Sequence, residues 1–296
     1  MNHHDRELLS IIVPVYNEVR TVLAVIERLQ EIDLPVAREI VIVNDGSTDG
    51  TREVLDAGLA LAPSAVEGLA PSALEGGSGI RVIHVSPNAG KGAAIRRGFS
   101  EARGTIVAIQ DADLELDPQQ LSTLLAPILR GDANVVYGSR FLAGRPDAPW
   151  MTIAGNRALT AVTNVLFGAS ITDMETCYKI MRTEVARSLA LDANRFDIEP
   201  QVTARLLRAG HRIHELPVKF DPRSRAQGKK IGWRDGVRAL EVLVRERFRK
   251  SKSQIPSSKS QIPSSKSQVP SSKSQIPSSK SQLPSSKSEI PTNKAP

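Results

Sequence analysis

Cysteines, aromatic side chains and long apolar runs are all scarce in this sequence, and each shortage excludes something. The 296 residues include one cysteine, Cys177, so no intrachain disulfide can form, and a reducing, cytoplasmic compartment is expected. No apolar run approaches the ~18 residues of a membrane-spanning helix, and residues 1–7 lack the apolar core of a signal peptide. Aromatic residues make up only 4% of the chain, so Val, Ile, Leu and Ala must fill the core.

The net charge of +7 comes from the C-terminal part of the chain. Lys250 to Pro296 contains eight lysines and one glutamate, so residues 1–249 carry no net charge and a nucleic-acid surface is not expected there. The same stretch repeats a Ser-Ser-Lys-Ser-Gln-Ile-Pro unit, and a proline in every unit excludes a continuous helix. We expect one domain over residues 1–249 and a disordered repeat tail over residues 250–296.

A second low-complexity segment interrupts the domain. Leu61–Gly68 is duplicated, with one change, as Leu69–Gly76, and each copy contains a proline and a glycine. One continuous helix is therefore not expected here. We interpret residues 58–79 as a surface insertion between a helix and the next strand, because lengthening a loop costs little free energy.

Short apolar runs alternate with segments of helical periodicity along the rest of the domain. This alternation predicts an α/β fold with a mostly parallel central sheet flanked by helices. The expected strands lie within residues 8–15, 39–43, 80–85, 106–109, 133–138, 171–180 and 211–220. Two late helices, 150–167 and 233–248, are amphipathic, and for the first a core-facing position and a membrane-surface position both remain open.

The strand at Ile106–Ile109 is followed at once by Gln110, Asp111, Ala112 and Asp113. Two carboxylates are costly to bury, so both should sit where the strand leaves the sheet, at the edge where open α/β sheets bind ligands. Two acids one residue apart suit a hard divalent cation that keeps water and phosphate oxygens as its other ligands. An Asp-rich turn that caps the next helix is the alternative explanation.

Further polar turns follow other strands of the predicted sheet. Asp45 lies just past the second strand and could reach a ribose or a base. Lys91 lies between Gly90 and Gly92 near a helix start, a combination that can hold phosphate but does not match a Walker A motif. The cationic stretch from Arg223 to Lys230 is either a solvated loop or a phosphate clamp. A nucleoside diphosphate with a divalent ion would satisfy all these groups.

Several of these segments resemble the family 2 glycosyltransferases of the GT-A fold, and within them the dolichyl- or polyprenyl-phosphate mannosyl- and glucosyltransferases. The matching segments are Val13–Glu18, Val43–Asp49, Asn88–Gly92, Asp111–Asp113, Gly138–Phe141, Asp173–Lys179 and Arg223 to Ile231. The resemblance spans about residues 8–248 without the insertion. It implies a GT-A, Rossmann-like sheet and an enzyme that inverts the anomeric centre in one displacement.

The resemblance also implies roles for individual residues. Those assigned to the nucleotide are Pro14, Tyr16, Glu18, Val43 and Asp45. Those assigned to the donor sugar diphosphate or the acceptor phosphate are Lys91, Asp111, Ala112, Arg140, Arg223 and Lys229. Asp113 and Glu115 would bind Mg²⁺ or Mn²⁺. Asp111, Asp113 and Asp173 are the candidate catalytic residues, and Asp173 and Glu175 are candidates for positioning the acceptor.

The expected activity is therefore metal-dependent transfer of a hexose from GDP-mannose or UDP-glucose to a polyprenyl or dolichyl phosphate, at the cytoplasmic membrane face. Peripheral contact with an anionic membrane would run through residues 150–167 and 233–248. Two alternatives stay open. One is the same fold acting on a soluble or saccharide acceptor, and the other is a non-catalytic nucleotide-sugar binding protein.

Overall fold

The computed structural model describes residues 7–61, 79–222 and 233–249. The C-terminal repeat tail and the loop with Arg223 and Lys229 lie outside these ranges, as does most of the predicted insertion. The predictions made for those segments therefore stay predictions. The remaining chain forms the α/β architecture that the alternating pattern indicates.

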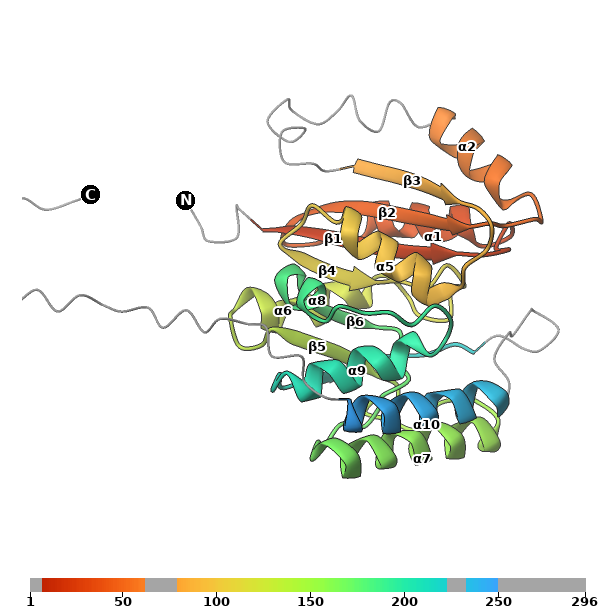
Figure 1. Ribbon diagram of the computed structural model, residues 1–296. Helices are drawn as coiled ribbons and strands as arrows, with labels where there is room; N and C mark the ends of the chain where they lie inside the picture. Colours follow the sequence, from red (N-terminus) through yellow and green to blue (C-terminus); the bar gives the residue numbers. More distant parts are fainter. Residues whose placement is uncertain (1–6, 62–78, 223–232, 250–296) are drawn as a thin grey trace, which may run out of the picture. The chain divides into compact units, whose positions relative to one another are not determined.

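A seven-stranded sheet forms the centre of the molecule, in the order β3-β2-β1-β4-β6-β5-β7 (Figure 1). The strands are β1 (Leu8–Val15), β2 (Ala37–Asp45), β3 (Gly79–Val85), β4 (Ile106–Ile109), β5 (Val135–Ser139), β6 (Lys179–Arg182) and β7 (His214–Pro217). Only β6 pairs antiparallel to its neighbours, so the other six strands share one direction. The predicted mostly parallel sheet is confirmed.

Eight helices within the described ranges connect and cover these strands. They are α1 (Val22–Glu31), α2 (Thr51–Leu61), α5 (Lys91–Glu101), α6 (Gln120–Leu129), α7 (Trp150–Phe167), α8 (Thr183–Ser188), α9 (Ile198–Arg208) and α10 (Trp233–Phe248). Two buried clusters show how the layers are built. One cluster joins α1, α2 and α6 to one face of the sheet, and the other joins α5, α8 and α9 to the opposite face.

The period-2 alternation of strand side chains explains why the sheet needs helices on both sides. Ile11 and Ile12 of β1 are both fully buried but belong to different clusters, and Val41 and Ile42 of β2 divide in the same way. Strands buried on both faces read as continuous apolar runs, which is how they appear in the sequence. Pro14 lies one residue before the end of β1, as expected for a residue without an N–H donor.

Strand β7 is shorter than the predicted strand over residues 211–220. It is an edge strand that pairs only with β5, along four residues from His214 to Pro217. The left-handed turn at Gly210 delays its start, because that glycine and His211 still donate to carbonyls of α9. The alternating pattern therefore extends beyond the residues that the sheet can pair.

Helices α7 and α10 pack side by side (Figure 1). A third, small cluster joins them: Leu243 of α10 and Ile171 are buried there, and Leu159 and Val162 of α7 pack against it. The apolar face predicted for α10 exists but points outward, since Val237, Leu240, Val244 and Phe248 are exposed, and the last of these is 75% exposed. Among the described residues, no helix has both the length and the apolarity of a membrane span.

Candidate functional site

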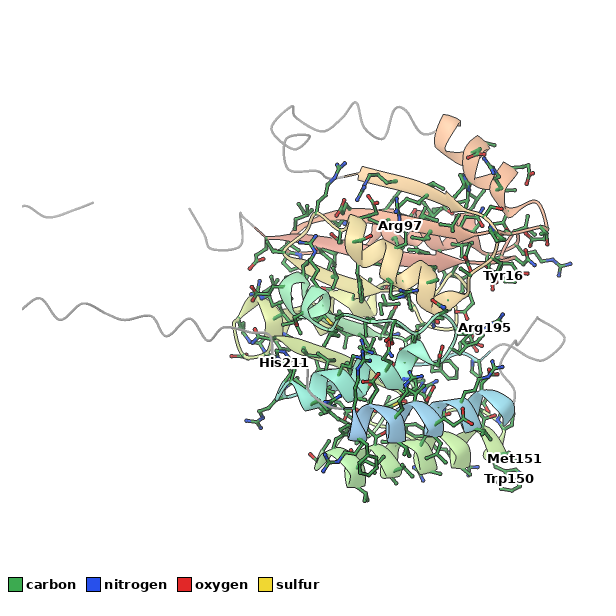
Figure 2. All side chains as sticks on the ribbon, in the orientation of Figure 1. Tyr16, Arg97, Trp150, Met151, Arg195 and His211 are labelled. Atoms are coloured by element: carbon green, nitrogen blue, oxygen red, sulfur yellow. The ribbon has the colours of Figure 1, made fainter. Side chains whose placement is uncertain are left out.

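The predicted site residues gather at one edge of the sheet because of strand direction. Strands β1, β2, β4 and β5 all end there, which places Tyr16, Asp45, Asp111 and Arg140 at the same edge. Strand β6 runs the other way, so its first residue lies at this edge and the loop before it, residues 171–178, arrives there too. Figure 2 shows Tyr16 and Arg195 on the side toward which the arrowheads of β1 and β4 point.

The segments after β1 and β2 are tied together by short polar contacts. The N–H of Asn17 donates to the hydroxyl of Ser47 at 2.9 Å, and the N–H of Thr48 donates to the side-chain oxygen of Asn17 at 2.8 Å. Val43 is fully buried within β2, whereas Pro14 and Glu18 are partly exposed and Tyr16 is exposed. The residues proposed to hold a nucleotide thus lie together, with Tyr16 presenting its ring to solvent.

Asp45 is almost fully buried and anchors the turn that leads into α5. Its carboxylate accepts the side-chain amide of Asn88 at 2.8 Å, the N–H of Ala89 at 2.9 Å and the N–H of Gly90 at 2.6 Å. A carboxylate that accepts three such bonds holds the turn in one shape. In the structure, Asp45 therefore shapes the turn that precedes Lys91. Its contact with a ribose or a base stays a prediction.

Gly90 and Gly92 are required by protein packing. The sequence suggested that these glycines let phosphate approach the backbone. Instead, a Cβ at Gly90 would lie 2.4 Å from the carbonyl oxygen of Asn194, and one at Gly92 would lie 2.5 Å from that of Ala193. The N–H of Ala93 also donates to Asn194 at 3.1 Å. The segment before α9 is thereby locked against the start of α5.

Lys91 lies between two carboxylates at the site edge. Its Nζ is 2.9 Å from both oxygens of Asp111 and 3.1 Å from Oε1 of Glu199. The other oxygen of Glu199 accepts from Lys179, which is fully buried. Burial alone would lower the pKa of Lys91, but Asp111 and Glu199 outweigh it and raise that pKa well above its usual value. Lys91 is therefore a permanent cation.

Hydrogen bonds from the side chains of Gln110 and Tyr178 hold the turn from Asp111 to Asp117. Gln110 donates to the carbonyls of Asp111 and Leu116, and Tyr178 donates its hydroxyl to both Gln110 and the carbonyl of Asp117. Leu114 has φ +62°, a left-handed conformation that is unfavourable for leucine. Backbone strain of this kind persists only where the surroundings impose it, and it is frequent at functional sites.

Asp113 and Glu115 fit a partial metal site. Oδ1 of Asp113 accepts the N–H of Glu115 at 3.1 Å, so the two residues belong to one tight turn. Within the described ranges, no three His, Cys, Asp or Glu side chains converge closely enough to hold an ion by themselves. Mg²⁺ and similar ions are held by one or two carboxylates when substrate phosphates and water supply the other ligands. The carboxylates after β4 match that ligand set.

Arg140 and Asp173 form a buried, two-point ion pair. Arg140 donates from Nε at 2.7 Å and from Nη2 at 2.8 Å, and its backbone N–H donates at 3.0 Å. Asp173 is fully buried, and Asp173 raises the pKa of Arg140 beyond what burial removes. Arg140 also lies over the ring of Phe220, 5.2 Å from its centroid. The structure thus places Asp173 as the partner that aims Arg140.

Two further titratable groups lie in the loop before β6. Burial, with a smaller contribution from Glu199, raises the pKa of Glu175 to about 7, and its buried Oε1 has no hydrogen-bond partner among the described residues. Burial, together with the charge of Asp111, raises the pKa of the Cys177 thiol well above its usual range. Cys177 is thus a protonated thiol at neutral pH, and not the thiolate that a nucleophile requires.

The raised pKa of Glu175 predicts a pH-dependent stability difference. The folded state keeps the proton up to about pH 7, whereas the unfolded chain releases it near pH 4.5, so the contribution is complete below pH 4.5 and is lost as pH rises to 7. Glu175→Gln should therefore match the wild type at pH 4.5 and exceed it by about 2 kcal/mol at pH 8, allowing for screening. Urea unfolding at both pH values measures this, with the exposed Glu241→Gln as control.

Glu199 and Lys179 are the residues that the sequence did not assign to the site. Lys179 is the first residue of β6, and Glu199 lies in the first turn of α9, so both are far from Lys91 along the chain. Glu199 appeared only as an acidic residue in the first turn of a helix, a position that the helix dipole favours by itself. Lys179 belongs to the Asp173–Lys179 motif, which was its only signal.

A mostly parallel seven-stranded sheet, with acids after β4 and cations after β5 and at the start of α5, is the architecture of the GT-A fold. Residues 10–189 match the family described as "Glycosyl transferase family 2". The chain therefore belongs to glycosyltransferase family 2.

Three proteins similar to this chain are 26–29% identical to it, and two of them carry a polyprenyl phosphate in their names. The undecaprenyl-phosphate mannosyltransferase of Micrococcus luteus is 29% identical over 78% of this chain and 90% of its own. The glycosyltransferase AglD of Haloferax volcanii is 28% identical over 73% of this chain, but this chain spans only 33% of its length. The dodecaprenyl-phosphate galacturonate synthase of Rhizobium johnstonii is 26% identical over 75% of this chain and 61% of its own.

Solved structures support the fold. Glucosyl-3-phosphoglycerate synthase from Mycobacterium tuberculosis, in complex with Mn²⁺ and UDP-glucose, has a TM-score of 0.58 at 20% identity. The alignment covers 81% of this chain and 79% of that chain. At this identity the likeness is one of fold.

Proposed function

We propose that this protein transfers a hexose from a nucleotide sugar, GDP-mannose or UDP-glucose, to a polyprenyl phosphate with inversion at the anomeric carbon. The observation that supports this most is the meeting of Lys91, Asp111 and the Arg140–Asp173 pair at one edge of the sheet. The names of the Micrococcus and Rhizobium relatives point to the same acceptor class.

The chemistry needs few groups. An oxygen of the acceptor phosphate attacks the anomeric carbon, the new C–O bond forms, and the bond to the donor diphosphate breaks with its electron pair leaving on that diphosphate. Lys91 would lie beside the leaving diphosphate and stabilise its charge. Arg140 uses Nε and one Nη for Asp173, which leaves its other Nη for a phosphate oxygen. A phosphate acceptor is already an anion, so no strong base is required.

Mg²⁺ or Mn²⁺ would be held by Asp113, with Glu115 as a second candidate ligand. When bound, the ion would neutralise charge on the donor diphosphate. Asp111, already paired with Lys91, would then share its charge between that lysine and the ion. Arg223 and Lys229, beyond the described residues, keep their proposed roles at the diphosphate or the acceptor phosphate, and Ala112 its proposed contact with the donor.

One observation favours a different acceptor. A carboxyl group with a pKa of about 7 and a free oxygen, as at Glu175, is suited to take a proton from an attacking hydroxyl. A soluble or saccharide acceptor with a hydroxyl nucleophile is therefore the second candidate function.

A transfer assay separates these possibilities. The protein is incubated with radiolabelled GDP-mannose or UDP-glucose, Mn²⁺ and undecaprenyl phosphate, and the label is extracted into organic solvent. Label in the organic phase is the expected result. Label that appears only in water-soluble product contradicts the lipid acceptor, and donor binding without transfer to any acceptor indicates a binding protein.

The exposed face of α7 and α10 suits the surface of an anionic membrane. Trp150, Met151 and Val165 of α7 are exposed, and that helix contains no acidic residue. On α10, exposed Val244 and its apolar neighbours run beside exposed Arg238 and Arg245, with one exposed acid, Glu241, between the two groups. Apolar and basic side chains on one face are the pattern of an interfacial helix. We propose that this face binds the membrane that holds the acceptor.

Val244→Glu should weaken binding to phosphatidylglycerol vesicles by about tenfold, because it places a carboxylate among buried acyl chains and repels the anionic surface. Vesicle sedimentation measures the effect. Leu23→Glu is the matched control, since Leu23 is also a partly exposed apolar residue but lies on α1. Equal losses in the two variants would contradict the assignment of this face.

A further inference from the structure

Four charged side chains form a continuous row from the interior to the candidate site. In order they are Lys179, Glu199, Lys91 and Asp111. Their charges alternate and sum to zero. Exposure of the side chains rises along the row, from 0% at Lys179 and 6% at Glu199 to 15% at Lys91 and 23% at Asp111. The row therefore connects a fixed interior charge to the surface where a donor diphosphate would bind.

Glu199 is the fixed member of this row. Lys179 donates to its Oε2 and to the carbonyls of Met174 and Thr176, so the lysine is itself held by three acceptors. Glu199 also lies in the first turn of α9, where the helix dipole favours a negative charge. A carboxylate held in this way presents Oε1 to Lys91 in one place.

The same short segment holds both the backbone and the side chain of Lys91. The carbonyl of Asn194 accepts the N–H of Ala93 at the start of α5, and Glu199, five residues later, binds the ammonium group. An ammonium has three N–H donors. Asp111 accepts a hydrogen bond from this ammonium, and Oε1 of Glu199 lies 3.1 Å from it as an ion-pair partner, so two carboxylates on different elements hold the ammonium in place.

We propose that Glu199 is a positioning residue of the donor site, which holds the ammonium of Lys91 by charge where it can meet the donor diphosphate. The inference rests on the proposed function, because it needs a nucleoside diphosphate in the site. Without Glu199, Lys91 would be held by Asp111 alone, which is more exposed. Lys91 would then pair with Asp111, near the proposed ion, and its ammonium group would be held less firmly beside the diphosphate.

The test is a double-mutant cycle that uses binding of GDP and of UDP, each with Mn²⁺, measured by calorimetry. Glu199→Gln should weaken binding by about tenfold, because Lys91 loses one of its two ion-pair partners in a partly buried place. The same substitution in a Lys91→Met background should have no further effect, because its partner is absent. Donor KM should rise by a similar factor while kcat stays within about twofold.

Two controls separate positioning from stability. Glu199→Gln leaves Lys179 buried without its carboxylate, so Glu199→Gln with Lys179→Met removes both interior charges and should recover stability but not diphosphate affinity. Glu246→Gln breaks a different buried ion pair, between Glu246 of α10 and Arg205 of α9. It should lower the stability of the protein and leave its affinity for the diphosphates unchanged.

Recovery of affinity in the Lys179→Met double variant would overturn the positioning role, since Glu199 would then only neutralise Lys179. Equal losses with and without Lys91 would overturn it as well. A wild-type protein that binds neither diphosphate overturns the proposed function, and the positioning role with it.

Discussion

Asp113→Ala should lower the rate of sugar transfer by about 10²–10³-fold, because it removes the carboxylate proposed to hold the divalent ion that neutralises the departing diphosphate. The variant should still fold. The side chain gives up the hydrogen bond from the N–H of Glu115, and a bond of this kind is worth about 1 kcal/mol. Initial rates at saturating donor, with and without Mn²⁺, measure the effect.

Asp132→Ala is the matched control for this substitution. Asp132 is an exposed acid after α6 that pairs with Arg130 at the surface, and its loss should leave turnover unchanged. If Asp113→Ala retains wild-type turnover and its dependence on Mn²⁺, the assignment of the site to the turn after β4 is wrong.

Arg140→Met should be the most destabilising of the substitutions considered, because it leaves the fully buried Asp173 without its partner. Breaking a buried ion pair from one side costs about 3–5 kcal/mol. Urea unfolding at pH 7.5 measures the loss. Adding Asp173→Asn should recover much of it, since the uncompensated charge disappears.

Activity separates the two roles of Arg140. The double variant Arg140→Met with Asp173→Asn should be nearly as stable as the wild type but deficient in transfer, because the guanidinium proposed to meet a phosphate is gone. If the single and double variants unfold at the same urea concentration, the unpaired carboxylate of Asp173 costs no stability, and the buried ion pair does not have the role assigned to it.

The sequence predicted the parts of the site that are local. Asp111 and Asp113 directly follow an apolar strand, and Lys91 lies at a helix start, so strand and helix signals alone place them at one edge of a parallel sheet. The same rules could not find Glu199. Its contact with Lys91 joins residues more than a hundred positions apart, and a Glu in a first helical turn needs no partner to be explained.

Two other features show why burial is harder to predict than structure. The periodicity of α10 correctly groups Val237, Leu240, Val244 and Phe248, yet that face is exposed, because α7 and α9 cover the side with Ala239 and Leu243. For Gly90, the sequence indicated close backbone approach but not the approaching group, which is the carbonyl of Asn194. Each outcome depends on tertiary neighbours that a local pattern does not contain.

The reversed direction of β6 has a consequence for how such a protein can diverge. Because β6 enters the sheet from the site edge, the loop that precedes it also reaches the site. Within the described residues, the site side chains therefore come from two contiguous stretches of the chain, 8–118 and 135–222. On the proposed function, the first stretch holds the donor and the second meets the acceptor. On that division, substitutions within residues 135–222 are expected to alter acceptor choice more than donor binding, and Glu199, which reaches back to Lys91, is the exception.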